Sequence, residues 1–119
     1  MIRADYRIGK IYDVIRLYFS ARYLFEGSVV ISVLSNVLPK ETVAICKKFF
    51  AGDVAGAMEL QKKYLALTNA LFSEVNPIPA KAAMAALGFC EDYLRLPLVP
   101  MSEGKRAHLL ECMRELNLL

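Results

Sequence analysis

The sequence predicts a mainly α-helical protein with one orphan β-strand, that is, a strand without a partner in the chain. Apolar residues recur three and four positions apart through most of the chain after residue 38, as in amphipathic helices. The run 29–34 is instead rich in β-branched residues without polar alternation, which is typical of a strand buried on both faces. Proline-rich junctions at 76–81 and 95–100 separate the later helices, because proline fixes φ and lacks a backbone N–H.

Composition fits one globular domain whose surface binds a partner. The chain has 119 residues, of which 56% are hydrophobic and 23% charged, so it can bury a core. This apolar content is high for a small domain with a large surface-to-volume ratio, and it predicts self-association. The net charge of +3 is spread along the chain, whereas nucleic-acid binding favours a basic run. We expect no nucleic-acid partner.

No segment has the properties of a membrane span or a signal peptide. The longest apolar stretch is far shorter than the roughly 18 residues of a spanning helix, and the N-terminus lacks an apolar core with a cleavage site. The cysteines are widely spaced without a CxxC pair, which favours buried thiols in a reducing cytoplasm: Cys46, Cys90 and Cys112. A soluble, cytoplasmic protein without a membrane partner is predicted.

The N-terminal segment, residues 1–26, is predicted to be one amphipathic helix. Its apolar residues Ile11, Val14, Ile15 and Tyr18 have helical spacing, among mixed charges. A basic amphipathic helix can lie on a membrane surface, but the tyrosines and the incomplete polar face favour packing against protein. Gly27 and Ser28 then interrupt the pattern before the strand.

Two longer helices are predicted after the strand. The first begins near Pro39 and ends at Gly52, and Asp53 is the N-cap of the second, which extends to about Glu74. The inner face of the first comprises Val43, Cys46, Phe49 and Phe50. The second carries a wide apolar stripe, which predicts packing against more than one helix: Ala57, Leu60, Tyr64, Leu67 and Leu71.

Two shorter helices complete the predicted order. Pro79 to Leu87 forms one, because Pro77 ends the preceding helix and Gly88 is a natural left-handed residue after a helix end. The extended stretch 95–100 leads to a last helix from about Glu103 to Leu116. Its inward side chains are Leu109, Leu110, Met113 and Leu116.

The residues alone predict no catalytic, metal or cofactor site. His108 and Cys112 are four apart on a helix, but a metal site needs three or four ligands, so they are interpreted as a surface histidine and a core thiol. Isolated glycines form no phosphate-binding loop. The cysteines lie in apolar helical patterns without a nearby base, and Lys81 is interpreted as a helix-start residue rather than a nucleophile.

From Gly27 to Leu119 the chain resembles the C-terminal part of dihydrodipicolinate synthase, a pyruvate-dependent aldolase-like lyase. Several segments carry the resemblance in the family's order and spacing: Val30-Ile31-Ser32-Val33, Ser35-Asn36-Val37, Ala51-Gly52-Asp53, Leu71-Phe72 with Glu74, Asn76 to Lys81, Gly88, and Arg95-Leu96-Pro97-Leu98 with Pro100. Residues 1–26 do not match the family, which has its seventh barrel strand there.

The resemblance implies that the chain is the last βα unit of a (β/α)8 TIM barrel plus a C-terminal helical extension. Residues 27–52 then hold the last barrel strand and its helix, and residues 53–119 hold the extension. This interpretation also explains the orphan strand, because its neighbours in a complete barrel are the first and seventh strands.

The resemblance also implies a chemistry that this chain carries only in small part. In the family, pyruvate forms a Schiff base with a strand lysine, a tyrosine relays protons, and the second substrate is aspartate semialdehyde in lysine biosynthesis. The lysine and the tyrosine lie upstream of the matched region and have no counterpart here. Ile31 alone carries over, as a residue lining the pyruvate pocket or simply as a barrel core residue.

We therefore expect a truncated dihydrodipicolinate synthase homologue that is inactive alone, without a cofactor. Its expected partner is itself or a full-length homologue. A stand-alone helical interaction or oligomerisation module is the alternative, supported by the apolar excess. A basic membrane-surface or nucleic-acid module led by residues 1–26 is a third hypothesis, which salt-dependent binding would reveal.

Overall fold

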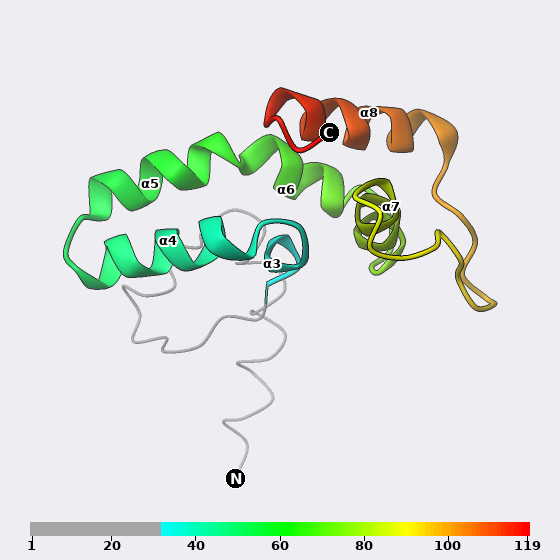
Figure 1. The fold of residues 1–119 in the computed structure, drawn as a ribbon, viewed down its shortest axis with the longest axis horizontal. Coiled ribbons are helices and arrows are strands. Elements are labelled where there is room, and N and C mark those ends of the chain that lie inside the picture. The colour runs from blue at the N-terminus through cyan, green and yellow to red at the C-terminus, as the bar shows by residue number, and fades with distance from the viewer. Residues whose placement is uncertain (1–31) are drawn as a thin grey trace, which may run out of the picture.

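The computed structural model describes residues 32–119. This part of the chain forms helices without a β-strand, in the order α3 (Leu34–Val37), α4 (Pro39–Phe50), α5 (Val54–Lys63), α6 (Leu65–Leu71), α7 (Ile78–Ala86) and α8 (Glu103–Glu115). Helices α4 and α5 form an antiparallel pair at one end, α7 and α8 lie at the other, and α6 joins the two groups (Figure 1). None of the described helices is long and apolar enough to cross a membrane. The mainly helical prediction is confirmed.

The predicted strand at 29–34 is wrong at its C-terminal end. Residues 29–31 lie outside the described residues, but Leu34 is the first residue of α3. The Ser35 amide donates a hydrogen bond to Ser32 Oγ at 3.1 Å, and Ser35 Oγ donates to the Ser32 carbonyl at 2.7 Å. These local bonds compete with a strand ladder and begin a helix. The β-branched composition alone did not reveal them.

The corner between α4 and α5 follows the predicted chemistry. Pro39 is the first residue of α4, and Gly52 has a φ of 86°, a left-handed conformation that glycine adopts without a Cβ penalty. Asp53 caps α5 by accepting a hydrogen bond from the Gly56 amide at 2.9 Å. Lys48 Nζ lies 2.7 Å from Asp53 Oδ2, so the end of α4 and the start of α5 are tied together.

The inner face of α4 differs in part from the predicted one. Val43 is 50% exposed and Phe50 65% exposed, whereas Ile45 is buried. Cys46 and Phe49 are partly buried against the core, as predicted. Helix α4 packs against α3 and α5, and Ile45 belongs to the buried core cluster, so the buried face of α4 includes Ile45 rather than Val43 and Phe50.

The predicted long helix from Asp53 to Glu74 is two helices. It is interrupted at Tyr64, whose φ of −96° and ψ of 4° lie outside helical values. The Thr68 hydroxyl donates a 2.9 Å hydrogen bond to the Tyr64 carbonyl, a contact that tends to bend helices. The break lets α5 pack against α4 while α6 packs against α7 and α8. The prediction of packing against more than one helix is confirmed.

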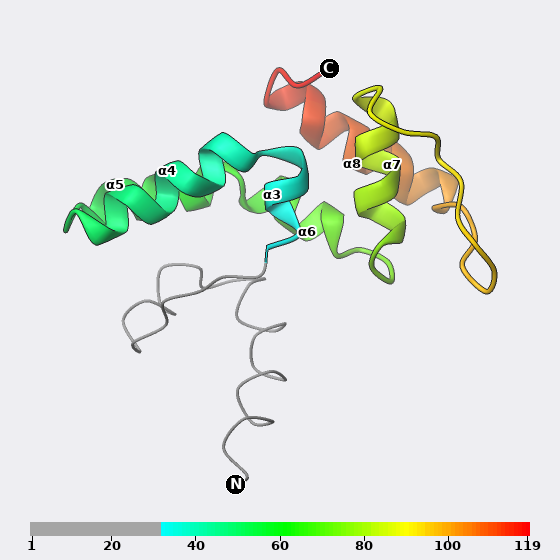
Figure 2. The same ribbon diagram turned by 60° about the horizontal axis from the view of Figure 1, so that its bottom comes forward.

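The core lies where α6, α7 and α8 meet. Among its side chains, Leu67, Leu71, Leu109 and Met113 have no more than trace exposure. Leu110 and Leu116 pack against it while partly exposed, so the inward face predicted for the last helix is confirmed. Seen after a 60° turn, α7 lies beside α8 and the segment after α7 extends away from both (Figure 2). The proline junctions contain two cis peptide bonds, Asn76–Pro77 and Leu96–Pro97.

The glycine after α7 provides a test of the predicted helix end. Gly88 has a φ of 79°, and Phe89 N donates to the Met84 carbonyl at 3.1 Å, as in a left-handed helix end. We expect Gly88→Ala to lower the free energy of unfolding by about 1 kcal/mol, because the left-handed conformation strains an L-residue. Gly104→Ala in the first turn of α8, where a Cβ meets open space, is the control and should raise it by about 0.5 kcal/mol. Urea unfolding of both variants measures the change in the free energy of unfolding. A stabilised Gly88→Ala variant would contradict the left-handed conformation of Gly88.

Candidate functional site

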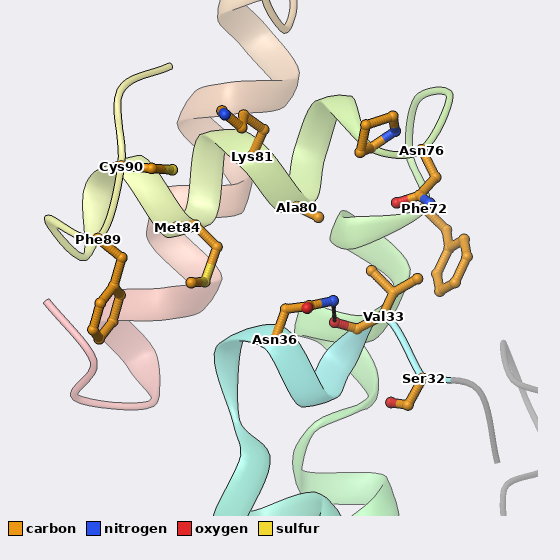
Figure 3. Close-up of a pocket in the computed structure, with 11 residues that line it drawn as sticks. Ser32, Val33, Asn36, Phe72, Asn76, Ala80, Lys81, Met84, Phe89 and Cys90 are labelled. Atoms are coloured by element: carbon orange, nitrogen blue, oxygen red, sulfur yellow. Dashed lines mark hydrogen bonds between the residues drawn. The ribbon is translucent and has the colours of Figure 1, made fainter. Parts of the chain in front are cut away.

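A cavity of about 400 Å³ opens between α3, the end of α6 and α7. Its apolar lining includes Val33, Phe72 and Met84, and polar side chains come from Asn76 and Lys81. Met84 extends from α7 toward α3, while Asn76 and Lys81 lie at the rim (Figure 3). The cavity therefore combines an apolar floor with a polar edge, an arrangement typical of binding sites.

Local hydrogen bonds hold the elements around this cavity. Asn36 Nδ2 donates to the Val33 carbonyl at 3.0 Å, which fixes one wall in α3. On the other wall, α7 begins directly after the Asn76–Pro77 corner, and Lys81 N donates to the Pro77 carbonyl at 2.8 Å. The proline corner thereby fixes where the side chains of the first two turns of α7 project.

Lys81 differs from two lysines of the described residues that form ion pairs. Lys48 pairs with Asp53, and Lys105 pairs with Glu74. Within residues 32–119, the Lys81 ammonium group makes neither an ion pair nor a side-chain hydrogen bond. It is nevertheless only partly exposed, on the rim of an apolar cavity. This unpaired positive charge is the main electrostatic feature of the cavity.

A second polar cluster joins the end of α6 to the start of α8. Glu74 Oε1 accepts hydrogen bonds from the Ser102 hydroxyl and from the Ser102 amide at 3.3 Å. Lys105 Nζ lies 3.7 Å from Glu74 Oε1 and donates to the Ser73 carbonyl at 2.9 Å. The hydrogen bond from the Ser102 hydroxyl, with smaller contributions from its amide and from Lys105, lowers the pKa of Glu74 below the ordinary value near 4.5.

This lowered pKa predicts a pH-dependent stability. Because folding favours the charged form of Glu74, its contribution is fully present above the ordinary pKa and is lost as the pH falls through the lowered one. We expect Glu74→Gln to be less stable than the unmodified chain at neutral pH, with the difference narrowing as the pH falls from about 5 to about 3. Thermal unfolding across this range is the measurement. A stability difference between the two proteins that does not depend on pH would mean that the charge of Glu74 does not contribute to stability.

The cysteines occupy three different environments. Cys112 is buried, as predicted, and Cys46 is partly buried, but Cys90 is exposed, because the chain leaves α7 after Gly88. The prediction of three buried thiols is wrong for Cys90. Burial raises the pKa of the Cys112 thiol above its ordinary value, and the charges of Glu115 and Glu111 raise it further.

Thiol labelling should separate these environments. We expect Cys90 to react with a maleimide at least about tenfold faster than Cys112 in the folded chain, because Cys90 is exposed, whereas burial shields the Cys112 thiol and raises its pKa. Mass spectrometry of timed samples measures each site. In urea the two rates should converge; equal rates without urea would contradict the burial of Cys112.

The residues considered for chemistry from the sequence are not brought together here. Ile31, the one expected pocket residue, lies outside the described residues. His108 is exposed, and its Nε2 lies 3.8 Å from the buried Cys112 Sγ, as the interpretation of a surface histidine and a core thiol implies. Within residues 32–119, no three His, Cys, Asp or Glu side chains are grouped to hold a metal ion.

Sequence reasoning missed the cavity itself. It used the Asn76 to Lys81 motif for the helix boundary and for the resemblance, and it placed Val33 in a strand. The separation of more than forty residues between α3 and α7 gives no local periodicity that would connect them. The one available signal was a lysine placed directly after a rigid corner.

Comparisons with known proteins agree on one family. Residues 18–116 match the dihydrodipicolinate synthetase family, so the match begins before Gly27, where the resemblance was expected to begin. The 4-hydroxy-tetrahydrodipicolinate synthase of Alkaliphilus oremlandii is 48% identical over 97 residues, which are 82% of this chain and 33% of that protein. The enzyme of the same name from Sorangium cellulosum is 54% identical over 88 residues, 74% of this chain and 29% of that protein. The chain thus spans about a third of the length of these curated relatives.

Solved structures give the same result. The crystal structure of dihydrodipicolinate synthase from Thermotoga maritima is similar with a TM-score of 0.78 and 45% identity, and the match covers 84% of this chain and 35% of that one. A structure described as the first monomeric dihydrodipicolinate synthase variant has a TM-score of 0.73 and 45% identity, over 76% of this chain and 30% of that one.

Proposed function

Because this chain belongs to the dihydrodipicolinate synthetase family, we propose that it corresponds to the C-terminal part of a dihydrodipicolinate synthase. In this proposal residues 27–52 supply the last barrel strand and its helix, and residues 53–119 supply the helical extension. The 119-residue chain alone is a truncated homologue that does not condense pyruvate with aspartate semialdehyde. Ile31 lines the pyruvate pocket once the barrel is present.

One observation carries the proposal. Residues 32–119 form the larger part of a chain that matches about a third of the Thermotoga maritima synthase with a TM-score of 0.78. Helices α3 to α8 therefore have the arrangement of a known synthase, although the described residues contain no barrel strand. Barrel enzymes of this type place their reacting groups at the ends of several strands, so the chemistry is assigned to the remaining two thirds of such a protein.

A graft tests this assignment. In the Thermotoga maritima synthase, the segment that matches residues 32–119 is replaced by these residues; this protein is called the graft below. We expect the graft to fold and to condense pyruvate with aspartate semialdehyde, whereas the 119-residue chain shows no turnover. The unmodified Thermotoga maritima enzyme is the control. A graft that does not fold, or that folds without activity, would contradict the proposal.

A further inference from the structure

The cavity between α3 and α7 lies where the proposed barrel meets the helical extension. Ser32, one of its lining residues, directly follows Ile31, the last-strand residue that the resemblance assigns to the pyruvate pocket. In (β/α)8 barrels the loops that leave the carboxyl ends of the strands form the catalytic face. Helix α3 is part of such a loop, so the cavity faces the catalytic side of the barrel. This step rests on the proposed function.

The lining of the cavity specifies the chemistry of its occupant. Val33, Phe72 and Met84 offer an apolar floor, and each is only partly buried in the described part of the chain. Lys81 and Asn76 offer hydrogen-bond donors at the rim, and neither side chain has a hydrogen-bond partner within residues 32–119. An ammonium group beside an apolar surface is costly to cover unless an opposite charge accompanies the covering group. The occupant must therefore combine an apolar side chain with a carboxylate.

We propose that this cavity receives a βα loop of the synthase barrel, whose carboxylate forms an ion pair with Lys81 and whose apolar side chain packs on Met84. The curated relatives are about three times as long as the matched segment, so a complete barrel accompanies this module in them. The volume of about 400 Å³ holds a few side chains. Lys81 then acts as a positioning residue that holds the helical extension against the catalytic face.

The test compares the same substitution in two proteins. Lys81→Met keeps the length of the side chain and removes its charge. In the 119-residue chain we expect no change in Tm, because the Lys81 ammonium group has no partner within residues 32–119. In the graft we expect Tm to fall by about 2–4 °C, because the barrel carboxylate loses its counter-charge at the rim of the cavity. Lys62→Met, at an exposed lysine of α5, is the matched control and should leave both proteins unchanged.

Two further measurements separate an ion pair from simple packing. The Tm difference caused by Lys81→Met in the graft should shrink in 1 M salt, because screening weakens an ion pair at a rim. Met84→Glu should also lower the Tm of the graft, since it places a second negative charge against the loop, and should leave the 119-residue chain unchanged.

The outcomes distinguish this inference from the proposed function. An active graft in which Lys81→Met has no effect would overturn the docking site and leave the proposed function intact. Equal effects in the graft and in the 119-residue chain would also overturn it, since Lys81 would then act within the 119-residue chain or between copies of it. A graft that is inactive or unfolded would overturn both.

Discussion

Replacing Leu109 with alanine is expected to lower the free energy of unfolding by about 2–5 kcal/mol, because it leaves a cavity that the core fills only partly. Leu109 is fully buried in α8, and this helix packs against both α6 and α7. A domain of this size is stable by only about 5–15 kcal/mol, so the variant should lose a large share of its stability. The urea midpoint, with the slope checked for two-state behaviour, is the measurement.

Leu110→Ala is the matched control for this prediction. Leu110 is the next residue of the same helix and is only partly buried. Because both residues are leucines, the change in helix propensity on substitution by alanine is the same. Leu110→Ala should lower the free energy of unfolding clearly less than Leu109→Ala does. Equal losses for the two variants would mean that α8 does not bury the face described here.

Ala82→Leu is expected to destabilise the chain by about 1–3 kcal/mol through overpacking. Ala82 lies fully buried in α7, where this helix meets α3, α6 and α8, and close packing leaves little room for three more carbon atoms. Ala66→Leu, at an exposed position of α6, adds the same atoms to a helix surface and should change stability by less than about 0.5 kcal/mol. Thermal unfolding compares the two; a neutral Ala82→Leu would indicate a loosely packed α7.

The helix boundaries could be predicted where a single residue determines them. Pro39 begins α4, Asp53 caps α5, and Gly88 follows α7 in a left-handed conformation. Proline, a capping carboxylate and glycine each act through their own backbone or a neighbouring amide. Their effect is local, so the sequence reveals it.

Features that depend on distant contacts were missed. The break at Tyr64 depends on α6 packing against α7 and α8 rather than following α5, and the Thr68 hydroxyl bond that accompanies it leaves no mark in the apolar spacing. In α4, the apolar pattern alone does not determine which face is buried, and Phe50 is exposed. Helix propensity and periodicity are weak predictors of helix breaks and buried faces where tertiary packing determines them.

The candidate site was not predicted from the sequence, although one of its residues, Lys81, was considered for another role. The residues alone predicted no cluster for catalysis, and the resemblance assigned the reacting groups to barrel elements upstream of the matched region. Lys81 was interpreted as a helix-start residue, and the structure places it in α7 on the rim of a cavity whose other wall is α3. The structure also shows that, within residues 32–119, its ammonium group forms no ion pair, whereas Lys105 pairs with Glu74.

Trapping of pyruvate with borohydride tests the central claim most directly. A lysine that forms an imine with pyruvate, with loss of water, is converted by borohydride into a stable secondary amine, and mass spectrometry then locates the added mass. We expect the 119-residue chain to gain no adduct and the graft to gain one, on a lysine of its Thermotoga maritima portion. A pyruvyl adduct on any lysine of the 119-residue chain would contradict the account.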